Sequence, residues 1–187
     1  EDASHAVGAE YDGRPVGCCK YSDITIFSFH PVKIITSGEG GAALTNCAKI
    51  DKRLKLLRSH GITREKSLMH DACDDGWYYE QIDLGFNYRM TDIHAALGLS
   101  QLARLDSYIR KRHEIAEIYD KGFDGSNVEK PYRNPANKSA LHLYVIKVDP
   151  GKHKSIFHAL RAKNIGVNLH YIPVHTQPYY KELGFSW

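Results

Sequence analysis

Lys33 is the residue whose surroundings in this sequence best suit covalent chemistry. It follows an apolar segment, 23–29, and belongs to a second one, 32–36, after which comes a glycine-rich turn, 37–41. Lysine is normally a surface residue, so one embedded among buried segments needs an explanation. A desolvated lysine amine can form a Schiff base with a carbonyl compound. A lysine with a buried stem and an ammonium group in water is structural instead, and this stretch by itself leaves both interpretations open.

Other polar residues could complete such a site, although each is a weak signal alone. Asp2 lies three positions before His5, and isolated residues of these types are usually solvated. Ser28 could bind a phosphate group or cap the backbone. Asn87 and Arg89 come just before the expected start of a helix, where free backbone N–H groups favour an anion. An isolated arginine, however, is more often part of a structural ion pair.

The composition is that of a soluble globular protein. The 187 residues are 42% hydrophobic and 25% charged, enough for one sizeable domain or one domain with part of another. The net charge of +3 arises from 25 basic and 22 acidic side chains without a basic run, which argues against nucleic-acid binding. No apolar stretch approaches the length of a membrane span and no signal-peptide pattern occurs, so we expect neither membrane insertion nor secretion.

The four cysteines, Cys18, Cys19, Cys47 and Cys73, lack C-x-x-C spacing. We therefore expect reduced thiols and a cytoplasmic protein. Cys73 lies close to His70 in a chain with 11 histidines, so metal-dependent hydrolysis is a distant alternative. We expect no metal site, because the histidines are scattered and no H-E-x-x-H arrangement occurs.

The apolar pattern predicts short strands alternating with helices. The expected strands or extended segments are 24–29, 32–36, 42–45, 141–148 and 165–171, and the expected helices are 51–59, 107–123 and 152–163. Thr91 can cap a further helix, whose apolar residues from Ile93 to Leu102 leave little polar surface, so we expect it to be buried. The segment 62–86 has no periodicity and is expected to be a long loop.

Several segments together resemble one family, the DegT/DnrJ/EryC1/StrS sugar aminotransferases, which are fold-type I enzymes dependent on pyridoxal 5'-phosphate (PLP). The matching segments follow the family's order and are Glu1–Ala9, Phe27–Lys33, Gly38–Gly41, Arg58–Gly61, Gly85–Met90 and His170–Tyr180. The resemblance favours the Schiff-base interpretation of Lys33. Within the family it is greatest to the 4-aminotransferases of UDP-linked 4-keto-6-deoxy sugars, above all the enzyme of pseudaminic acid biosynthesis.

The resemblance implies a role for each polar residue around the cofactor. Lys33 would hold PLP as a Schiff base and move the proton between substrate and cofactor. Asp2 would pair with the pyridinium nitrogen, which keeps the ring an electron sink. His5 would lie against the 3-oxygen of the ring, and Ser28 would donate to the cofactor phosphate. Asn87 would reach the phosphate of a neighbouring subunit, so the implied assembly is a homodimer with shared active sites.

The implied reaction is the transfer of an amino group from an amino-acid donor, expected to be glutamate, to a 4-keto-6-deoxy nucleotide sugar. It belongs to amino-sugar and glycan biosynthesis. His30, Arg89 and Tyr171 are the candidates for substrate contacts, with Arg89 meeting a carboxylate or a phosphate. Lys33 also argues against the dehydratase relatives, in which histidine replaces this lysine.

The implied fold class is α/β. Residues 1–123 would be the C-terminal portion of the large PLP-binding domain, a mainly parallel sheet flanked by helices, with a connecting helix. Residues 124–187 would be part of a smaller α+β domain. Members of the family are considerably longer, so we expect the chain to lack the N-terminal part of the large domain. The alternative is therefore a truncated, non-catalytic piece that dimerises or binds nucleotide sugar without turnover.

Overall fold

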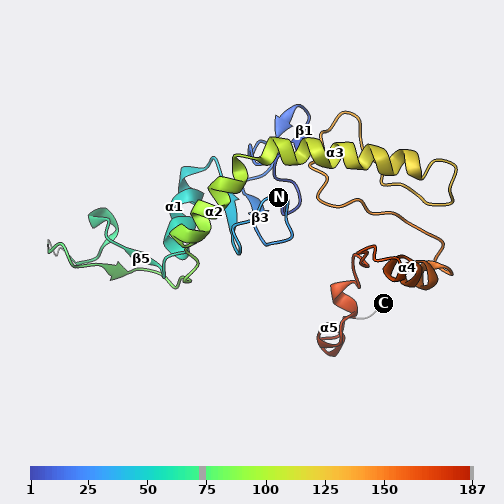
Figure 1. The fold of residues 1–187 in the computed structure, drawn as a ribbon. Coiled ribbons are helices and arrows are strands. Elements are labelled where there is room, and N and C mark those ends of the chain that lie inside the picture. The colour runs from blue at the N-terminus through green and yellow to red at the C-terminus, as the bar shows by residue number, and fades with distance from the viewer. Residues whose placement is uncertain (72–74, 186–187) are drawn as a thin grey trace. The chain divides into compact units, whose positions relative to one another are not determined.

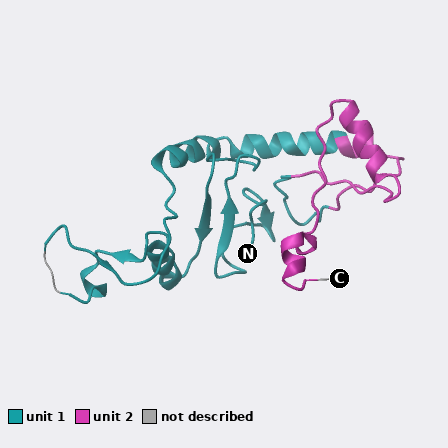
Figure 2. Cartoon of the chain, turned by 90° about the horizontal axis from the view of Figure 1, so that it is seen from below, with its two compact units in different colours: residues 1–118, 133–142 teal, residues 119–132, 143–187 magenta. Residues whose placement is uncertain are grey.

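The structure is a computed structural model that describes residues 1–71 and 75–185. It divides into two compact units, coloured separately in Figure 2, which are residues 1–118 with 133–142 and residues 119–132 with 143–187. Helix α3 (Leu105–Gly122) begins in the first unit and ends in the second.

The strands and most of the helical residues belong to the first unit. Its elements in Figure 1, besides α3, are β1 (Glu10–Tyr11), β2 (Arg14–Pro15), β3 (Thr25–Ser28), β4 (Gly41–Leu44), α1 (Ala48–Leu57), β5 (Ile62–Thr63), the 3-10 helix η1 (Lys66–Leu68), β6 (Glu80–Gln81) and α2 (Asp92–Leu102). The second unit contains α4 (His153–Ala162), the 3-10 helix η2 (Val174–Thr176) and α5 (Pro178–Glu182). The strands pair antiparallel as β1–β2, β3–β4 and β5–β6.

Strand β3 is the strand beside which the candidate site is built. It pairs antiparallel with β4 along its full length. On its other edge the start of the chain runs parallel to it, with Asp2 bridged to Ile26. The Ile26 amide donates to the Glu1 carbonyl and the Ala3 amide to the Ile26 carbonyl, both at 2.9 Å. Alternation along the strand buries Phe27 and turns Ile26 outward.

The segment 32–36 forms a turn, which corrects the strand or extended segment expected there. The Lys33 amide donates to the His30 carbonyl at 2.9 Å, and the Ser37 amide donates to the Phe29 carbonyl at 3.0 Å. These two bonds fold the chain back after β3. Ile34 and Ile35, which made the segment resemble a strand, are buried instead of being arranged along a sheet, whereas Val32 is exposed.

The core of the first unit lies under this turn and the start of α3. Its buried residues are Ala9, Ile34, Ile109 and Ala140, and partly buried Ala6, Val7, Val16 and Leu105 pack against them. Ile35, next to Ile34, is also buried, at 3% exposure. Burying two large aliphatic side chains stabilises the turn by roughly 3–6 kcal/mol relative to leaving them exposed, so the backbone around Lys33 is held firmly.

The segment 62–86 is not the structureless loop that its sequence predicts. In its described part, β5 and β6 pair with Ile62 opposite Gln81 and Thr63 opposite Glu80. Each strand is only two residues long, too short to produce a detectable alternation. Residues 72–74, which include Cys73, lie outside the described residues.

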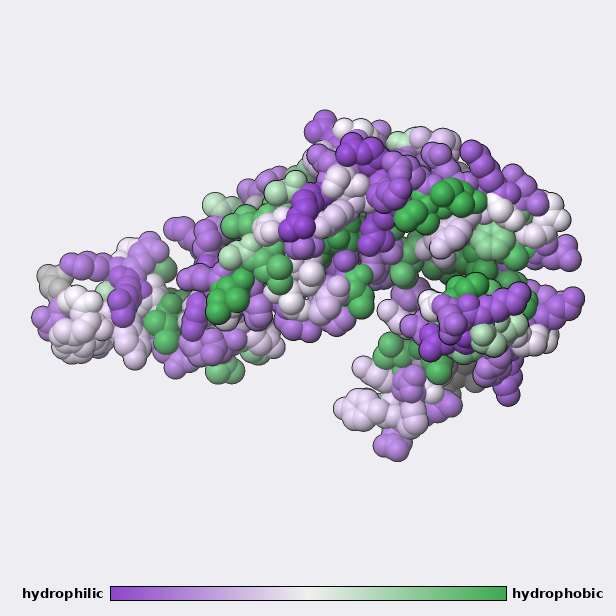
Figure 3. Space-filling view, in the orientation of Figure 1, coloured by the Kyte–Doolittle hydropathy of each residue, from purple (hydrophilic) through white to green (hydrophobic). Residues whose placement is uncertain are grey.

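Helix α2 begins as the sequence predicts but is not buried in this chain. The Thr91 hydroxyl accepts a hydrogen bond from the His94 amide at 3.2 Å, so Thr91 is the N-cap. Yet Ile93 is 82% exposed and Leu99 is 68% exposed. The expectation of burial is therefore wrong for this chain, because no described element covers that face of the helix. Figure 3 shows apolar surface in the region of α2.

In the second unit, the predicted helix near 152–163 is present as α4, whereas the two predicted strands beside it are wrong. Residues 143–148 make a single bridge, Lys147 with Glu129, and residues 165–171 are irregular. A short apolar run becomes a strand only where a neighbour accepts its backbone hydrogen bonds. The Tyr144 hydroxyl instead donates to Asp120 at 2.7 Å, and its ring lies against Tyr119.

Candidate functional site

Lys33 lies on the turn that follows β3, with its side chain half-buried. Among the described residues its amine has neither a hydrogen bond nor an ion pair. The two residues that follow it, Ile34 and Ile35, anchor the turn in the core. The chain therefore holds the backbone of Lys33 in place and leaves its amine without a hydrogen bond or ion pair among the described residues, as covalent chemistry at Lys33 would require.

Asp2 lies beside β3, and its local contacts keep its carboxylate ionised. The Ser4 hydroxyl donates to Oδ1 at 2.6 Å and the Ser4 amide donates to the same oxygen at 3.0 Å. These two bonds are the main cause of the lowered pKa of Asp2, and the positive charges of His5 and Lys33 lower it further. Oδ2 receives no hydrogen bond from any described residue, so one carboxylate oxygen remains open to a cationic partner.

Asp2, His5 and Lys33 therefore share one electrostatic neighbourhood at the edge of β3. The sequence places Asp2 and Lys33 thirty-one positions apart, and the parallel bridge between Asp2 and Ile26 brings them together. The centroid of the His5 ring lies 4.2 Å from that of His142, the last residue of the first unit.

Ser28 and His30 lie at the end of β3, on the way to Lys33. Ser28 is opposite Gly41 in the β3–β4 ladder, and its hydroxyl accepts from the His30 amide at 3.4 Å. His30 is exposed, with Nε2 3.9 Å from a carboxylate oxygen of Glu39. A Cβ at Gly41 would lie 2.6 Å from the Phe27 carbonyl oxygen, so glycine is needed for the strands to pair this closely.

Asn87 and Arg89 lie on a second stretch of extended chain, between β6 and α2. Asn87 is bridged to Ser59, and the Tyr88 amide donates to the Arg58 carbonyl at 2.9 Å. Both candidate side chains are exposed. This pairing joins the residues after α1 to those before α2, and it positions Asn87 and Arg89.

Two glycines allow that pairing to form. Gly61 has φ +69°, and a Cβ there would collide with the carbonyl oxygen of Asp83. A Cβ at Gly85 would collide with the backbone at His60 and Gly61. Gly61 and Gly85 both belong to segments that match the family. Two backbones approach closely at each of them, which explains why glycine is needed there.

Tyr171 lies in the second unit, exposed, with its ring 3.9 Å from the ring of His170. The other predicted site residues all belong to the first unit: Asp2, His5, Ser28, His30, Lys33, Asn87 and Arg89. The sequence prediction missed Ser4, Arg64 and Tyr79, which the structure places at Asp2 or in the second pocket described next. The Asp-x-Ser spacing could have indicated Ser4, since aspartate often bonds the backbone two residues on; nothing in the sequence singles out the other two.

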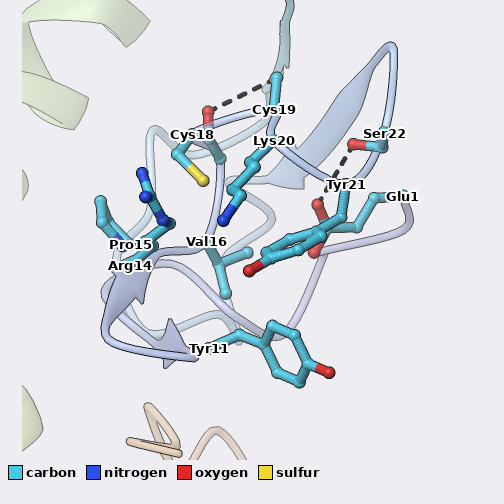
Figure 4. A pocket seen from close by; sticks show the side chains of 11 residues that line it. Glu1, Tyr11, Arg14, Pro15, Val16, Cys18, Cys19, Lys20, Tyr21 and Ser22 are labelled. Carbon is cyan, nitrogen blue, oxygen red and sulfur yellow. Dashed lines mark hydrogen bonds between the residues drawn. The ribbon is translucent and has the colours of Figure 1, made fainter.

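Two pockets lie in the first unit, and neither is lined by Asp2 or Lys33. The larger, about 380 Å³, lies near the start of β3 (Figure 4). There the rings of Tyr11 and Tyr21 meet edge to face at 5.4 Å, and the Lys20 amine lies 5.2 Å from the Tyr21 ring centre. The smaller, about 280 Å³, is lined by residues of the Asn87 pairing and includes Arg89.

Other kinds of site were also sought in the described part of the chain. It has no group of three or more histidine, cysteine or acidic residues placed to hold a metal ion. Cys18, Cys19 and Cys47 are free thiols, and Cys73 lies outside the described residues. None of the described helices combines the length and apolar character needed to cross a bilayer.

A lysine amine in the electrostatic neighbourhood of an aspartate with a lowered pKa suits Schiff-base chemistry. The comparisons with known proteins point to a family. The model of the DegT/DnrJ/EryC1/StrS aminotransferase family matches residues 1–186. The chain therefore belongs to this family.

Two of the relatives are named for a sugar transaminase and for polysaccharide biosynthesis. The chain is 41% identical over 187 residues to the UDP-4-amino-4,6-dideoxy-N-acetyl-beta-L-altrosamine transaminase of Campylobacter jejuni subsp. jejuni serotype O:23/36, covering 98% of this chain and 47% of the relative. It is 36% identical to the spore coat polysaccharide biosynthesis protein SpsC of Bacillus subtilis, covering 100% and 49%. The chain thus spans about half the length of the curated relatives it matches.

Solved structures show the same likeness. The sugar aminotransferase Spr1654 of Streptococcus pneumoniae in its PLP form superposes with a TM-score of 0.85 at 34% identity, covering 98% of this chain and 46% of that one. Helicobacter pylori PseC, described as an aminotransferase of pseudoaminic acid biosynthesis, gives 0.86 at 34% identity, covering 97% and 47%. The α/β fold expected from the sequence is confirmed by these neighbours.

Proposed function

We propose that this chain is part of a PLP-dependent aminotransferase that transfers an amino group, from glutamate, to a 4-keto-6-deoxy nucleotide sugar in amino-sugar biosynthesis. Family membership and the names of the relatives support the reaction class. The observation that carries the proposal is the placement of the half-buried, partnerless Lys33 amine near the ionised Asp2 carboxylate.

The residues around β3 fit PLP by their chemistry. Lys33 supplies the amine that would hold the cofactor covalently, and Asp2, with its open Oδ2, would pair with the pyridinium nitrogen. His5 would lie against the ring oxygen, and Ser28 and Asn87 would donate to phosphate. When bound, PLP supplies an electron sink for the bond changes at the substrate carbon.

The chain's own residues would do the remaining work. The hydrogen bonds from Ser4 hold the pKa of the Asp2 carboxyl below its usual range, so Asp2 would favour a positive charge beside it. Lys33 would also be the base that moves a proton at the substrate carbon. His30, Arg89 and Tyr171 are proposed for contacts with the substrate.

The same proposal extends to the assembly and the whole architecture. The exposed apolar residues of α2 are consistent with a homodimer in which Asn87 serves the neighbouring subunit's cofactor. We place the large-domain portion at 1–123 and the small-domain portion at 124–187, with the large domain's sheet mainly parallel once complete. The free thiols at Cys18, Cys19 and Cys47 are consistent with a cytoplasmic enzyme.

The absorption spectrum of the whole enzyme incubated with PLP tests the proposal. We expect a visible band from covalently held cofactor that Lys33→Ala abolishes. Lys52→Ala, an exposed lysine on α1, is the matched control and should leave the band unchanged. A band that persists in Lys33→Ala would reject the proposal.

One observation favours the alternative, a non-catalytic piece that dimerises or binds nucleotide sugar without turnover. The chain spans about half the length of the curated relatives it matches. Dialysis of the 187-residue chain with PLP distinguishes the two: retention of one cofactor per chain, or per pair of chains, contradicts the alternative.

A further inference from the structure

The ring of His142 packs against the ring of His5. The two centroids lie 4.2 Å apart and the ring planes are tilted by 54°. His5 lies on the turn that follows Asp2 and shares its electrostatic neighbourhood. A residue from the far end of the first unit's sequence therefore meets the residue proposed to lie against the ring oxygen of the cofactor.

The backbone of His5 is fixed, whereas its side chain is exposed. The Ala6 amide donates to the Ala3 carbonyl at 2.9 Å, which closes a turn around His5, and Ala3 is 3% exposed. An exposed histidine side chain can adopt several rotamers, so this turn places the Cα of His5 without choosing the direction of its ring. A neighbouring ring restricts that choice, and His142 supplies one.

The backbone of His142 is held by two side chains of α3. The Arg112 guanidinium donates to the Leu141 carbonyl at 3.1 Å and to the His142 carbonyl at 3.2 Å. One residue further along α3, Nε2 of His113 lies 2.8 Å from the Ser139 carbonyl oxygen. The Leu141 amide also donates to the Ser139 hydroxyl at 3.1 Å. The segment 139–142 is therefore tied to α3 at both of its ends.

The same segment is anchored in the core under the Lys33 turn. Ala140 is 1% exposed and belongs to the cluster that includes Ile34. Leu141 is buried and has φ +51°, a backbone conformation that residues with a side chain rarely adopt. Such a conformation persists only where the surrounding structure determines it. The core that fixes the backbone of Lys33 thus also fixes the backbone of His142, whose ring atom Nδ1 is buried.

We propose that His142 is a positioning residue, whose ring holds the His5 ring in the orientation in which His5 meets the 3-oxygen of PLP. A ring packed at a tilt against a second ring gains from the contact and loses freedom to rotate. His142 acts through His5 and is assigned no contact with cofactor or substrate. The role toward the cofactor rests on the proposed function, whereas the contact between the two rings does not.

Titration of the whole enzyme with PLP, followed by the visible absorption band, tests this role without turnover. We expect His5→Ala to weaken PLP binding about ten-fold, the loss of one hydrogen bond to a charged group. His142→Ala should weaken it about three-fold, because an unrestrained His5 ring occupies the binding orientation only part of the time.

Three further variants separate ring packing from other causes. His142→Phe keeps a flat ring and should restore the wild-type affinity for PLP, whereas His142→Gln keeps only a polar group and should not. His153→Ala removes an exposed histidine of α4 and is the matched control, which should bind PLP as the wild type does. Restoration by His142→Gln but not by His142→Phe overturns the proposal.

The double variant His5→Ala/His142→Ala shows whether His142 acts through His5. In that case the double variant should bind PLP no more weakly than His5→Ala alone. A further three-fold loss in the double variant, or unchanged affinity in His142→Ala, overturns the proposal.

Thermal melts of the wild type, both single variants and the double variant, all without PLP, measure the ring contact independently of the cofactor. We expect the losses in melting temperature to be non-additive, because each single variant already removes the contact. Additive losses reject the contact and the positioning role with it. A wild-type enzyme that forms no cofactor band rejects the proposed function and the role toward PLP, while non-additive melts would still establish the contact.

Discussion

The turn that carries Lys33 and the pairing that carries Asn87 and Arg89 are held in different ways. Around Lys33, large side chains are buried: Ile34 is 5% and Ile35 is 3% exposed. Around Asn87 the contacts are backbone hydrogen bonds and glycine-mediated approaches, and the neighbouring rings are exposed. The first region holds the backbone of the lysine proposed for Schiff-base chemistry through a core, and the second leaves the side chains of Asn87 and Arg89, proposed for binding, exposed.

This difference matters because the two jobs have different tolerances. Covalent chemistry needs an atom placed within a fraction of an ångström, which a packed core provides. Binding of a charged group tolerates small movements, since guanidinium groups on long side chains can follow it. The variants below act on one region and not on the other.

The largest effect is expected at Lys33 itself. Lys33→Ala should lower kcat of the whole enzyme about 10³-fold or more, because it removes both the covalent attachment and the proton-moving base. Stability should change little, since the Lys33 amine has no partner among the described residues. Rate assays and thermal melts on the same preparation measure both quantities. If Lys33→Ala unfolds as well as losing activity, the Lys33 side chain also contributes to stability, which would contradict this prediction.

The next effect concerns the anchor of the Lys33 turn. Ile34→Ala should destabilise the protein by about 2–5 kcal/mol, because it leaves a cavity in the core. Ile93 of α2 is 82% exposed, so Ile93→Ala is the matched control. In a monomer it should change the free energy of unfolding by no more than about 0.5 kcal/mol. Chemical denaturation measures both. If α2 lies at a dimer interface, Ile93→Ala instead makes the melting temperature depend more steeply on protein concentration.

A smaller effect is expected in the pairing that holds Asn87. Gly61→Ala should cost more than about 2 kcal/mol, since it adds a backbone collision at Asp83 to an unfavourable positive φ. Gly13→Ala shares the positive φ, +67°, but meets no atom within 4 Å, so it should cost only about 1 kcal/mol. Equal losses measured by denaturation would show that the close approach at Gly61 contributes nothing.

The smallest effect is local and depends on pH. Glu80 accepts hydrogen bonds from the His70 and Asp71 amides, which lower its pKa from 4.5 to about 2. Because the pKa is depressed in the folded chain, ionised Glu80 stabilises the hairpin fully above about pH 4.5, and that contribution is lost as the pH falls toward 2. NMR shifts of those two amides should report this change.

Glu80→Gln gives the control for that titration. The variant should remove the acid-dependent change at both amides. It should also bring the pKa of Tyr78, raised to about 12 first by burial and then by its bond to Asp71, closer to its usual value of 10, since the Glu80 charge also raises it. An identical acid titration in variant and wild type would show that another group controls the hairpin.

Much of the candidate site was accessible from the sequence because its signals are local. The apolar residues around Lys33, the Thr91 cap and the amphipathic pattern of α3 depend on spacing along the chain. The glycine runs indicated tight turns for the same reason. Helices near 51–59, 107–123 and 152–163 were predicted with shifts of a few residues at their ends.

The errors arose where a strand or a buried face needs a partner from elsewhere. Ile34 and Ile35 look like strand residues, but the bond from Ser37 to Phe29 folds them into the core. The segments at 141–148 and 165–171 lack neighbouring strands in the described chain, so their alternation has no ladder to join. The apolar residues of α2 predicted a buried helix, but no described element of this chain covers them.

The sequence by itself therefore determined the residue types for Schiff-base chemistry, the Thr91 cap of α2 and the family motifs, because each depends on neighbouring positions. Only the tertiary structure decided that Asp2 lies near Lys33, through the parallel pairing of residues 1–3 with β3. It alone brought Arg64 into one pocket with Arg89. Contacts between distant positions follow from packing and backbone pairing, which no local pattern specifies.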